Sequence, residues 1–264
     1  MACLIIKEFF SKVDDLTLSI PYLIPILVER LNAEDLEGVD YLDDKMKPVS
    51  IQKAQEIMDP IEKSEQVRVC IAEIVTIIVS STIFDCMRPY CMQFVNILKA
   101  LCMDPYGDVI IEGTRGISAF CVSGEEQLIH FCEAMGRSLF TAFVHKHANV
   151  RIAGLRALFN VMLAGQWKTS YAVLECMVGF RDPNIVPIKE FYDPSTKLNY
   201  FAMFIVDRST QVRIVFYQTM GKLLMDLPDR VDMEGRIFPY LISGLYDPHE
   251  DIRTCAFDLI EELG

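Results

Sequence analysis

A short pattern that joins an acidic residue to an arginine six positions later returns along this chain at intervals of about 40 residues, and it constrains the fold more than any other feature. The first and last positions of its five copies are Glu62 and Arg68, Asp104 and Ile110, His145 and Arg151, Asp207 and Arg213, and Asp247 and Arg253. Val or Ile stands just before the arginine position; the second copy has lost the arginine and the third has lost the acid. A unit this short cannot bury its own apolar face, so its copies must stack on one another.

Apolar residues at helical spacing fill the segments between the turns, which predicts helices throughout the chain. The predicted helices cover 2–13, 20–31, 65–80, 86–102, 108–122, 125–144, 149–164, 168–180, 196–206, 210–226, 234–245 and 250–263. A period of roughly 40–47 residues with two helices per unit is typical of HEAT and armadillo arrays. The sequence therefore predicts an all-α, HEAT- or armadillo-like α-solenoid, a right-handed superhelix of about six helix pairs.

Two stretches interrupt this periodicity within what we expect to be a single array over residues 1–264. Residues 33–63 are acidic and only weakly periodic, which predicts a loop insertion. Residues 182–195 contain three prolines, and this second insertion accounts for the longer interval between the third and fourth copies. Asp-Pro pairs recur at predicted turns between helices, where proline disfavours helix in the residue before it.

The composition indicates which kinds of partner the protein binds and in which cellular compartment it lies. The net charge is −12, which argues against a surface for nucleic acid or an anionic membrane. The nine cysteines form no disulfide framework, and most lie in apolar helical stretches (Cys70, Cys121, Cys176, Cys255), so we expect a reducing, cytoplasmic compartment. The N-terminal sequence lacks signal-peptide features, and the most apolar run, 71–79, is shorter than the ~20 residues that span a bilayer.

No combination of residues predicts catalysis, a metal or a cofactor. His145 and His147 lie two apart in a turn, without two further zinc ligands nearby. His130 and Cys132 are two apart on a predicted helix and point away from each other. The sequence holds no Gly-rich phosphate loop, Gly-x-Ser-x-Gly turn or His-Glu-x-x-His helix. We therefore expect no enzymatic activity, no cofactor and no small-molecule substrate, and partners that are proteins.

The recurring acid and arginine support two interpretations. In the structural one, each turn acid meets an arginine of its own or the adjacent second helix and fixes how units stack; an exposed pair of this kind contributes only ~0–1 kcal/mol. In the other, the residues bind a partner. Recurrence favours the structural interpretation, because a binding site has no reason to return in every unit. The residues of this inter-repeat ladder are Glu62, Arg68, Asp104, Arg151, Asp207, Arg213, Asp247 and Arg253.

Trp167 is the sole tryptophan, and it follows Gly165 in a predicted turn. An exposed tryptophan is a candidate anchor for a partner protein. A cap over the core between units is an equal alternative.

Several longer runs go beyond the general pattern of helical arrays. They are 87–90 (MRPY), 97–99 (ILK), 104–109 (DPYGDV), 145–153 (HKHANVRIA), 223–230 (LLMDLPDR), 238–242 (FPYLI) and 261–264 (EELG). In these runs the chain resembles the HEAT-repeat family of axonemal dynein assembly factors. The resemblance extends discontinuously from about residue 20 to residue 264, and neither insertion belongs to the family pattern.

The resemblance implies a non-enzymatic cytoplasmic scaffold that acts in the pre-assembly of axonemal dynein arms. Its implied partners are axonemal dynein chains, chaperones or other assembly factors. The alternative is a different HEAT-repeat adaptor, such as a karyopherin-like carrier or a phosphatase scaffold, which would share only the fold.

Overall fold

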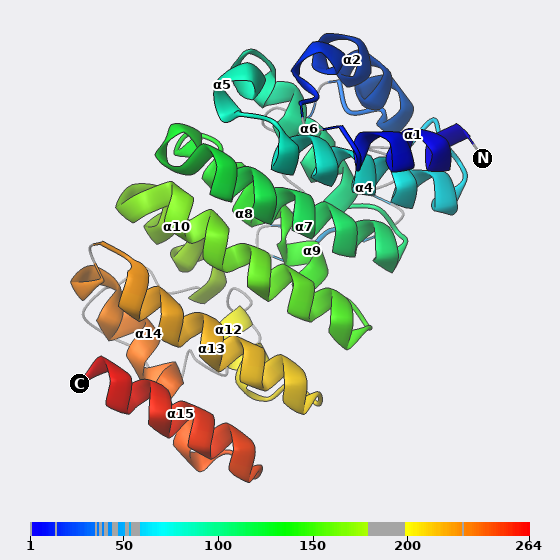
Figure 1. The fold of residues 1–264 in the computed structure, drawn as a ribbon. Helices are drawn as coiled ribbons and strands as arrows, with labels where there is room; N and C mark the ends of the chain where they lie inside the picture. Colours follow the sequence, from blue (N-terminus) through cyan, green and yellow to red (C-terminus); the bar gives the residue numbers. More distant parts are fainter. Residues whose placement is uncertain are drawn as a thin grey trace.

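The helices of this protein are stacked in two layers, as a computed structural model shows (Figure 1). The structure describes residues 2–13, 15–34, 36, 39, 42, 43, 47–50, 53, 59–178, 199–228 and 230–264. Beyond helices and turns, these residues contain an isolated β-bridge between Leu42 and Pro48. The predicted all-α solenoid is confirmed. The insertion predicted at 182–195 lies outside the described residues.

One layer consists of helices that lie side by side in chain order (Figure 1). They are α1 (Ala2–Phe10), α4 (Glu65–Ser81), α7 (Gly107–Gly124), α10 (Ala148–Val178), α13 (Thr210–Asp226) and α15 (Glu250–Leu263). We call them the second-helix layer, because each of α4 to α15 is the second helix of its unit and carries the arginine position of the pattern in its first turns. Ser64 caps α4 by accepting the backbone N–H of Val67, as serine does at many helix starts.

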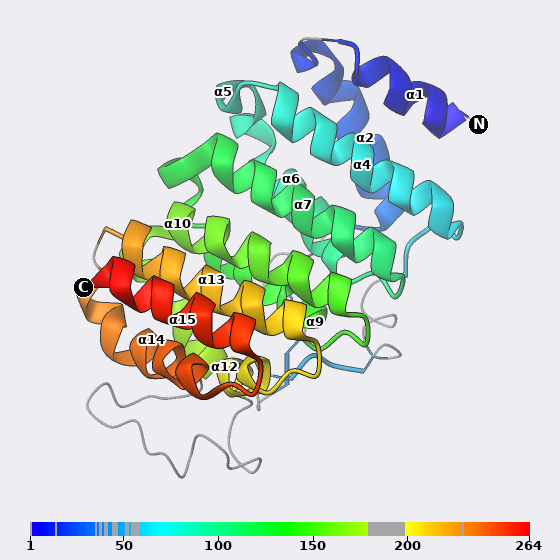
Figure 2. The ribbon, with the colours of Figure 1, turned by 60° about the horizontal axis from the view of Figure 1, so that its bottom comes forward.

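The other layer holds the first helix of each unit and lies behind the second-helix layer in the turned view (Figure 2). It contains α2 (Ile20–Leu31), α5 (Phe84–Met87), α6 (Cys91–Cys102), α8 (Cys132–Ser138), α9 (Phe140–Phe143), α12 (Tyr200–Ile205) and α14 (Val231–Ser243). Pro21 sits in the first turn of α2, where no N–H bond is lost, and Asn32 closes that helix in the left-handed conformation, with φ of 53°.

Two predicted helices are wrong in detail. The helix predicted over 86–102 is broken by a 3₁₀ turn at Arg88–Tyr90, where Pro89 cannot donate a backbone hydrogen bond. The one predicted over 125–144 is a 3₁₀ turn at Glu125–Leu128 followed by α8 and α9. The break predicted between the helices over 149–164 and 168–180 is present within α10, where Gln166 has a non-helical backbone with φ of 49° and ψ of −158°.

Aromatic rings fill the core between the layers where the units meet. Phe143 contacts both Tyr200 and Phe204, with ring centroids 5.8 Å and 5.4 Å apart, and all three are fully buried. Phe201 meets Tyr240 edge to face at 5.1 Å. Such tilted and edge-to-face pairs add about 0.5–1.5 kcal/mol each beyond the burial of their area.

Glycines let the second helices approach the first helices of their own units. A Cβ on Gly113 would lie 2.8 Å from the Cβ of Leu101, and one on Gly154 would lie 2.9 Å from the Cβ of Ala142. Real Cβ atoms do not come this close, so the packing of α7 and α10 depends on the missing side chain.

Candidate functional site

The first rung of the ladder joins two neighbouring units. Arg68, in the first turn of α4, places its Nε 2.5 Å from Oδ2 of Asp104, and its Nη2 donates to Oδ1 at 3.1 Å. Its Nη1 donates to the carbonyls of Glu62 and Lys63, at 3.1 Å and 3.0 Å. The hydrogen bond to Asp104 is the largest of the effects that raise the pKa of Arg68. One guanidinium therefore binds the turn of its own unit and the carboxylate of the next.

Arg151 on α10 repeats this geometry. Its Nη2 donates to Oδ1 of Asp207 at 2.8 Å, and its Nη1 donates to the carbonyls of His145 and Lys146 at 2.7 Å and 3.2 Å. Its Nε lies 2.7 Å from Oδ2 of Asp207, an ion-pair distance, but outside hydrogen-bond geometry. The hydrogen bond between the side chains of Arg151 and Asp207 therefore comes from Nη2.

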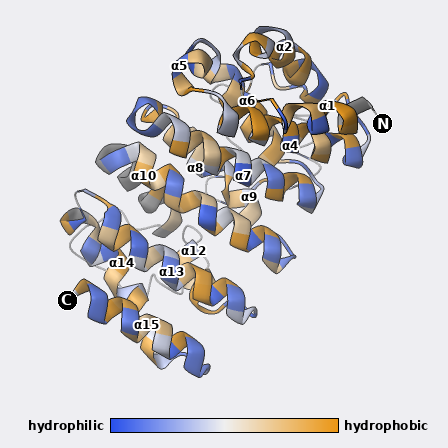
Figure 3. Cartoon of the chain, in the orientation of Figure 1, coloured by the Kyte–Doolittle hydropathy of each residue, from blue (hydrophilic) through white to orange (hydrophobic). Residues whose placement is uncertain are grey.

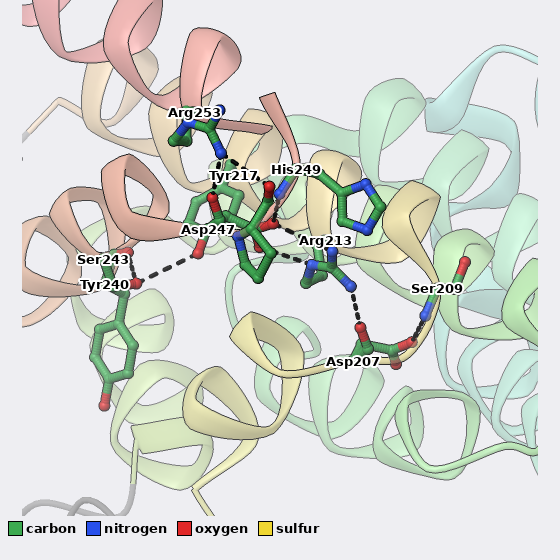
Figure 4. Close-up of polar contacts among 10 residues, drawn as sticks. Asp207, Ser209, Arg213, Tyr217, Tyr240, Ser243, Asp247, His249 and Arg253 are labelled. Atoms are coloured by element: carbon green, nitrogen blue, oxygen red, sulfur yellow. Dashed lines mark hydrogen bonds and ion pairs between the residues drawn. The ribbon is translucent and has the colours of Figure 1, made fainter. Parts of the chain in front are cut away.

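Arg213 on α13 forms the third rung (Figure 4). Its Nε donates to Oδ2 of Asp247 at 2.8 Å and its Nη2 to Oδ1 at 3.2 Å. Its Nη1 donates to the carbonyl of Asp207 at 2.5 Å. Asp207 thus accepts from Arg151 through its side chain and from Arg213 through its main chain, which connects successive rungs.

Each acceptor carboxylate is also oriented by its own turn. The Oδ1 atoms of the aspartates accept backbone N–H groups two residues further on, at 2.8–2.9 Å. The three pairs are Asp104 with Tyr106, Asp207 with Ser209 and Asp247 with His249. Aspartate makes such turns readily, so the carboxylate is already held in place when the arginine meets it.

The ladder is buried, whereas the sequence suggested exposed pairs. The paired side chains of the three rungs are between 2 % and 9 % exposed. A buried pair gives little net stability over apolar residues of the same shape, but loss of one partner leaves an uncompensated charge and costs about 3–5 kcal/mol. These pairs therefore destabilise any stacking of two successive units in which the arginine of one does not meet the aspartate of the next.

The junction between α7 and α10 has an apolar contact in place of a rung. Ile110, which occupies the arginine position, is buried with Ala142 and Val150. His145 occupies the acid position, and a Cβ on Gly107 would lie 3.2 Å from its Cε1. Burial is the main cause that lowers the pKa of His145, and the nearby His147, Lys146 and Arg151 lower it further.

The two outermost residues of the ladder have partners of a different kind. Oε1 of Glu62 accepts the N–H of Ser64 at 2.9 Å, while its Oε2 lies 3.8 Å from Nη1 of Arg30. Arg253 donates through Nη1 to the carbonyls of Asp247 and Pro248, at 2.7 Å and 2.9 Å. In the described part of the chain, no carboxylate forms an ion pair with Arg253.

The sequence also singled out a tryptophan, two histidines and several cysteines. Trp167 lies in the helical backbone of α10 just after the kink, and its side chain lies outside the described residues. The rings of His145 and His147 are 5.3 Å apart, and the described residues hold no group of three or more His, Cys, Asp or Glu suited to a metal ion. Cys70 and Cys121 are buried, Cys255 is half-buried, and the side chain of Cys176 lies outside the described residues.

A groove that sequence reasoning missed runs between α7 and α10 in the second-helix layer. Its volume is about 550 Å³. Arg115 from α7 and Arg156 from α10 line it, with Asn149 at its start. Both arginines stand five residues after the arginine position of the pattern, so aligning the five copies would have brought them together.

The family of this chain follows from its sequence. The model of the family described as "Dynein axonemal assembly factor 5-like, TPR repeats" matches residues 48–178 and 195–264, well over half of the chain. The chain belongs to this family. The expectation drawn from the resemblance of its longer runs is thereby confirmed.

Two relatives carry the same name. Dynein axonemal assembly factor 5 of Xenopus laevis is 23 % identical over 246 residues, which cover 93 % of this chain and 24 % of that protein. The Homo sapiens protein of that name is 22 % identical over 205 residues, covering 78 % of this chain and 21 % of that protein. The chain thus spans about a quarter or less of the length of these relatives.

The fold also has a solved counterpart. A designed armadillo repeat protein in complex with the peptide (KR)4 matches with a TM-score of 0.55 at 15 % identity, covering 91 % of this chain and 99 % of that chain. At this identity the match shows the armadillo-like fold alone. Within the described residues, no helix is long and apolar enough to cross a membrane.

Proposed function

We propose that this chain is a non-enzymatic cytoplasmic scaffold in the pre-assembly of axonemal dynein arms. The observation that carries the proposal is the family match over residues 48–178 and 195–264 on an all-α solenoid. Both curated relatives are named as dynein axonemal assembly factors. Solenoids act through extended surfaces that bind other chains, which fits a scaffold better than a catalyst. The proposed partners are dynein chains, chaperones or other assembly factors, with no nucleic acid, membrane, cofactor or small-molecule substrate.

The ladder serves this function indirectly. It holds the stacked units of a single array in register, so that the second-helix layer presents a fixed surface to its partners. Burial of all three rungs supports this structural role, because a buried carboxylate or guanidinium cannot reach a partner protein. Trp167 stays a candidate partner anchor.

The test is loss of the protein in cells that build motile cilia. Knockout cells should assemble axonemes that lack dynein arms in electron micrographs, and re-expression of the protein should restore the arms. Affinity purification from cells that are growing cilia should recover dynein heavy or intermediate chains with chaperones. Intact arms in the knockout would overturn the proposal, as would a purified complex built on a nuclear transport GTPase or a phosphatase catalytic subunit.

A further inference from the structure

The groove between α7 and α10 differs from its surroundings in charge and in the contact at its junction. Figure 1 shows these two helices side by side in the middle of the second-helix layer. Of the junctions between α4, α7, α10, α13 and α15, theirs is the one where Ile110 and His145 replace the arginine–aspartate pair. The groove therefore lies beside an apolar contact, where α7 has no arginine that pairs with the turn of the next unit.

Small side chains keep the groove open. Thr114, Ser118 and Ala119 line it from α7, and Ala153 and Ala157 line it from α10. Two half-buried apolar side chains, Ile111 and Ile152, complete the apolar part of its wall. A hollow of about 550 Å³ with this lining has room for short side chains of a bound segment.

The charge at the groove is opposite to that of the chain as a whole. Arg115 and Arg156 are exposed, although the chain carries a net charge of −12. Arg115 is held by an ion pair with Glu112 on the same helix, whereas among the described residues no acid forms an ion pair with Arg156. The corresponding positions of the flanking units hold Glu73, Gln218 and Asp258.

The start of α10 adds to this positive potential. Its first turn contains no acidic residue, and Asn149 from that turn lines the groove. Lys146 is exposed in the turn just before it. The first turn of a helix favours negative charge, because its N–H groups are unsatisfied and the helix dipole is positive there. On α7, Asp108 is exposed in the first turn and is not one of the residues that line the groove.

We propose that this groove binds an acidic peptide segment of a partner protein, in which Asp or Glu alternates with small apolar residues. Arg156 and Arg115 bind its carboxylates, since guanidinium groups pair with carboxylates through two parallel hydrogen bonds. The apolar wall takes the small side chains between them. The inference rests on the proposed scaffold function, because it names the chemistry of one partner site of that scaffold.

Figure 3 shows hydrophilic segments beside apolar ones along the second helices. Charged residues outside the groove also attract or repel a charged peptide, so the test must separate general electrostatic attraction from binding in the groove. The probe is a fluorescein-labelled peptide of eight Glu-Ala repeats, titrated with the protein and followed by fluorescence anisotropy. The opposite-charge control is the matching Lys-Ala peptide. Arg156→Glu and the double variant Arg115→Glu with Arg156→Glu test the groove. Lys222→Glu makes the same charge change on α13, where Lys222 is exposed and does not line the groove.

We expect the acidic peptide to bind the wild-type protein at low salt, at least tenfold more weakly to Arg156→Glu, and not measurably to the double variant. Lys222→Glu should keep the affinity within twofold. Since both arginines are exposed, thermal unfolding of the variants should stay close to wild type and exclude loss of the fold. Failure of the acidic peptide to bind, preference for the Lys-Ala peptide, or equal weakening by Lys222→Glu would overturn the assignment.

The result of the peptide-binding test can be told apart from the result of the tests of the scaffold function. If dynein chains are recovered from ciliating cells while the peptide fails to bind, the scaffold stands and the groove assignment falls. If the peptide binds while knockout cells keep their dynein arms, the groove binds acidic segments in some other assembly.

Discussion

Arg213 on α13 meets Asp247 in the turn before α15, with Nε donating to Oδ2 at 2.8 Å and Nη2 donating to Oδ1 at 3.2 Å. The two residues belong to successive units, and their side chains are 9 % and 4 % exposed. Their contact therefore couples the stability of one unit to the position of the next.

Replacing Arg213 with alanine should destabilise the protein strongly, because it leaves the carboxylate of Asp247 buried without its counter-charge. We expect a loss of about 3–5 kcal/mol in the free energy of unfolding, measured by urea denaturation. Arg253→Ala is the matched control, since Arg253 donates to two carbonyls but has no described carboxylate partner. Its loss should be smaller, about 1–2 kcal/mol. Equal effects of the two variants would contradict the assigned role of the aspartate.

The apolar junction between α7 and α10 allows the opposite experiment, in which an arginine–aspartate pair is introduced. Ile110→Arg places a guanidinium among Ala142 and Val150, where the turn offers His145 in place of an aspartate. The unpaired buried charge should cost about 3–5 kcal/mol. Adding His145→Asp supplies the missing acceptor and should recover a large part of that loss. A double variant no more stable than Ile110→Arg alone would show that the geometry of this junction cannot accept a rung.

The sequence predicted the repeat, the fold class and the positions of the arginines, because period and helical spacing are local properties of the chain. It left open whether each acid meets the arginine of its own or of the adjacent helix, because that depends on how units stack. It also missed the breaks in the first helices near Arg88 and Leu128. The first of them contains Pro89, which has no backbone N–H, so apolar spacing alone does not predict where a helix is continuous. The α7–α10 groove went unnoticed because its two arginines are 41 residues apart and come together only when units are aligned.

Gly113 and Gly235 offer a matched pair of glycine-to-alanine substitutions in helices. A Cβ on Gly113 would lie 2.8 Å from the Cβ of Leu101 and 3.1 Å from the backbone nitrogen of Cys102, whereas one on Gly235 meets no atom within 4 Å. Gly113→Ala should therefore cost about 1–3 kcal/mol through overpacking. Gly235→Ala should stabilise the protein by up to about 1 kcal/mol, since alanine has the higher helix propensity. Thermal unfolding followed by circular dichroism would show the two shifts in opposite directions.

His145 should make the stability of the protein depend on pH. Burial in the folded state lowers its pKa below the ordinary value of 6.5, so the unfolded chain binds a proton more readily than the folded one. The contribution of neutral His145 is therefore complete above pH 6.5 and is lost as the pH falls through 6.5 toward the folded-state pKa.

The test variant is His145→Asn, because Nδ1 of His145 accepts the N–H of His147 at 3.2 Å and an asparagine oxygen can accept it without titrating. Urea denaturation of both proteins at pH 7.5 and pH 5.5 should show a smaller loss of stability on acidification in His145→Asn than in wild type. The difference between the two proteins isolates the contribution of this imidazole from the effects of acidification that both proteins share. If both proteins lose the same stability between the two pH values, folding does not lower the pKa of His145, and this imidazole does not make the stability of the junction between α7 and α10 depend on pH.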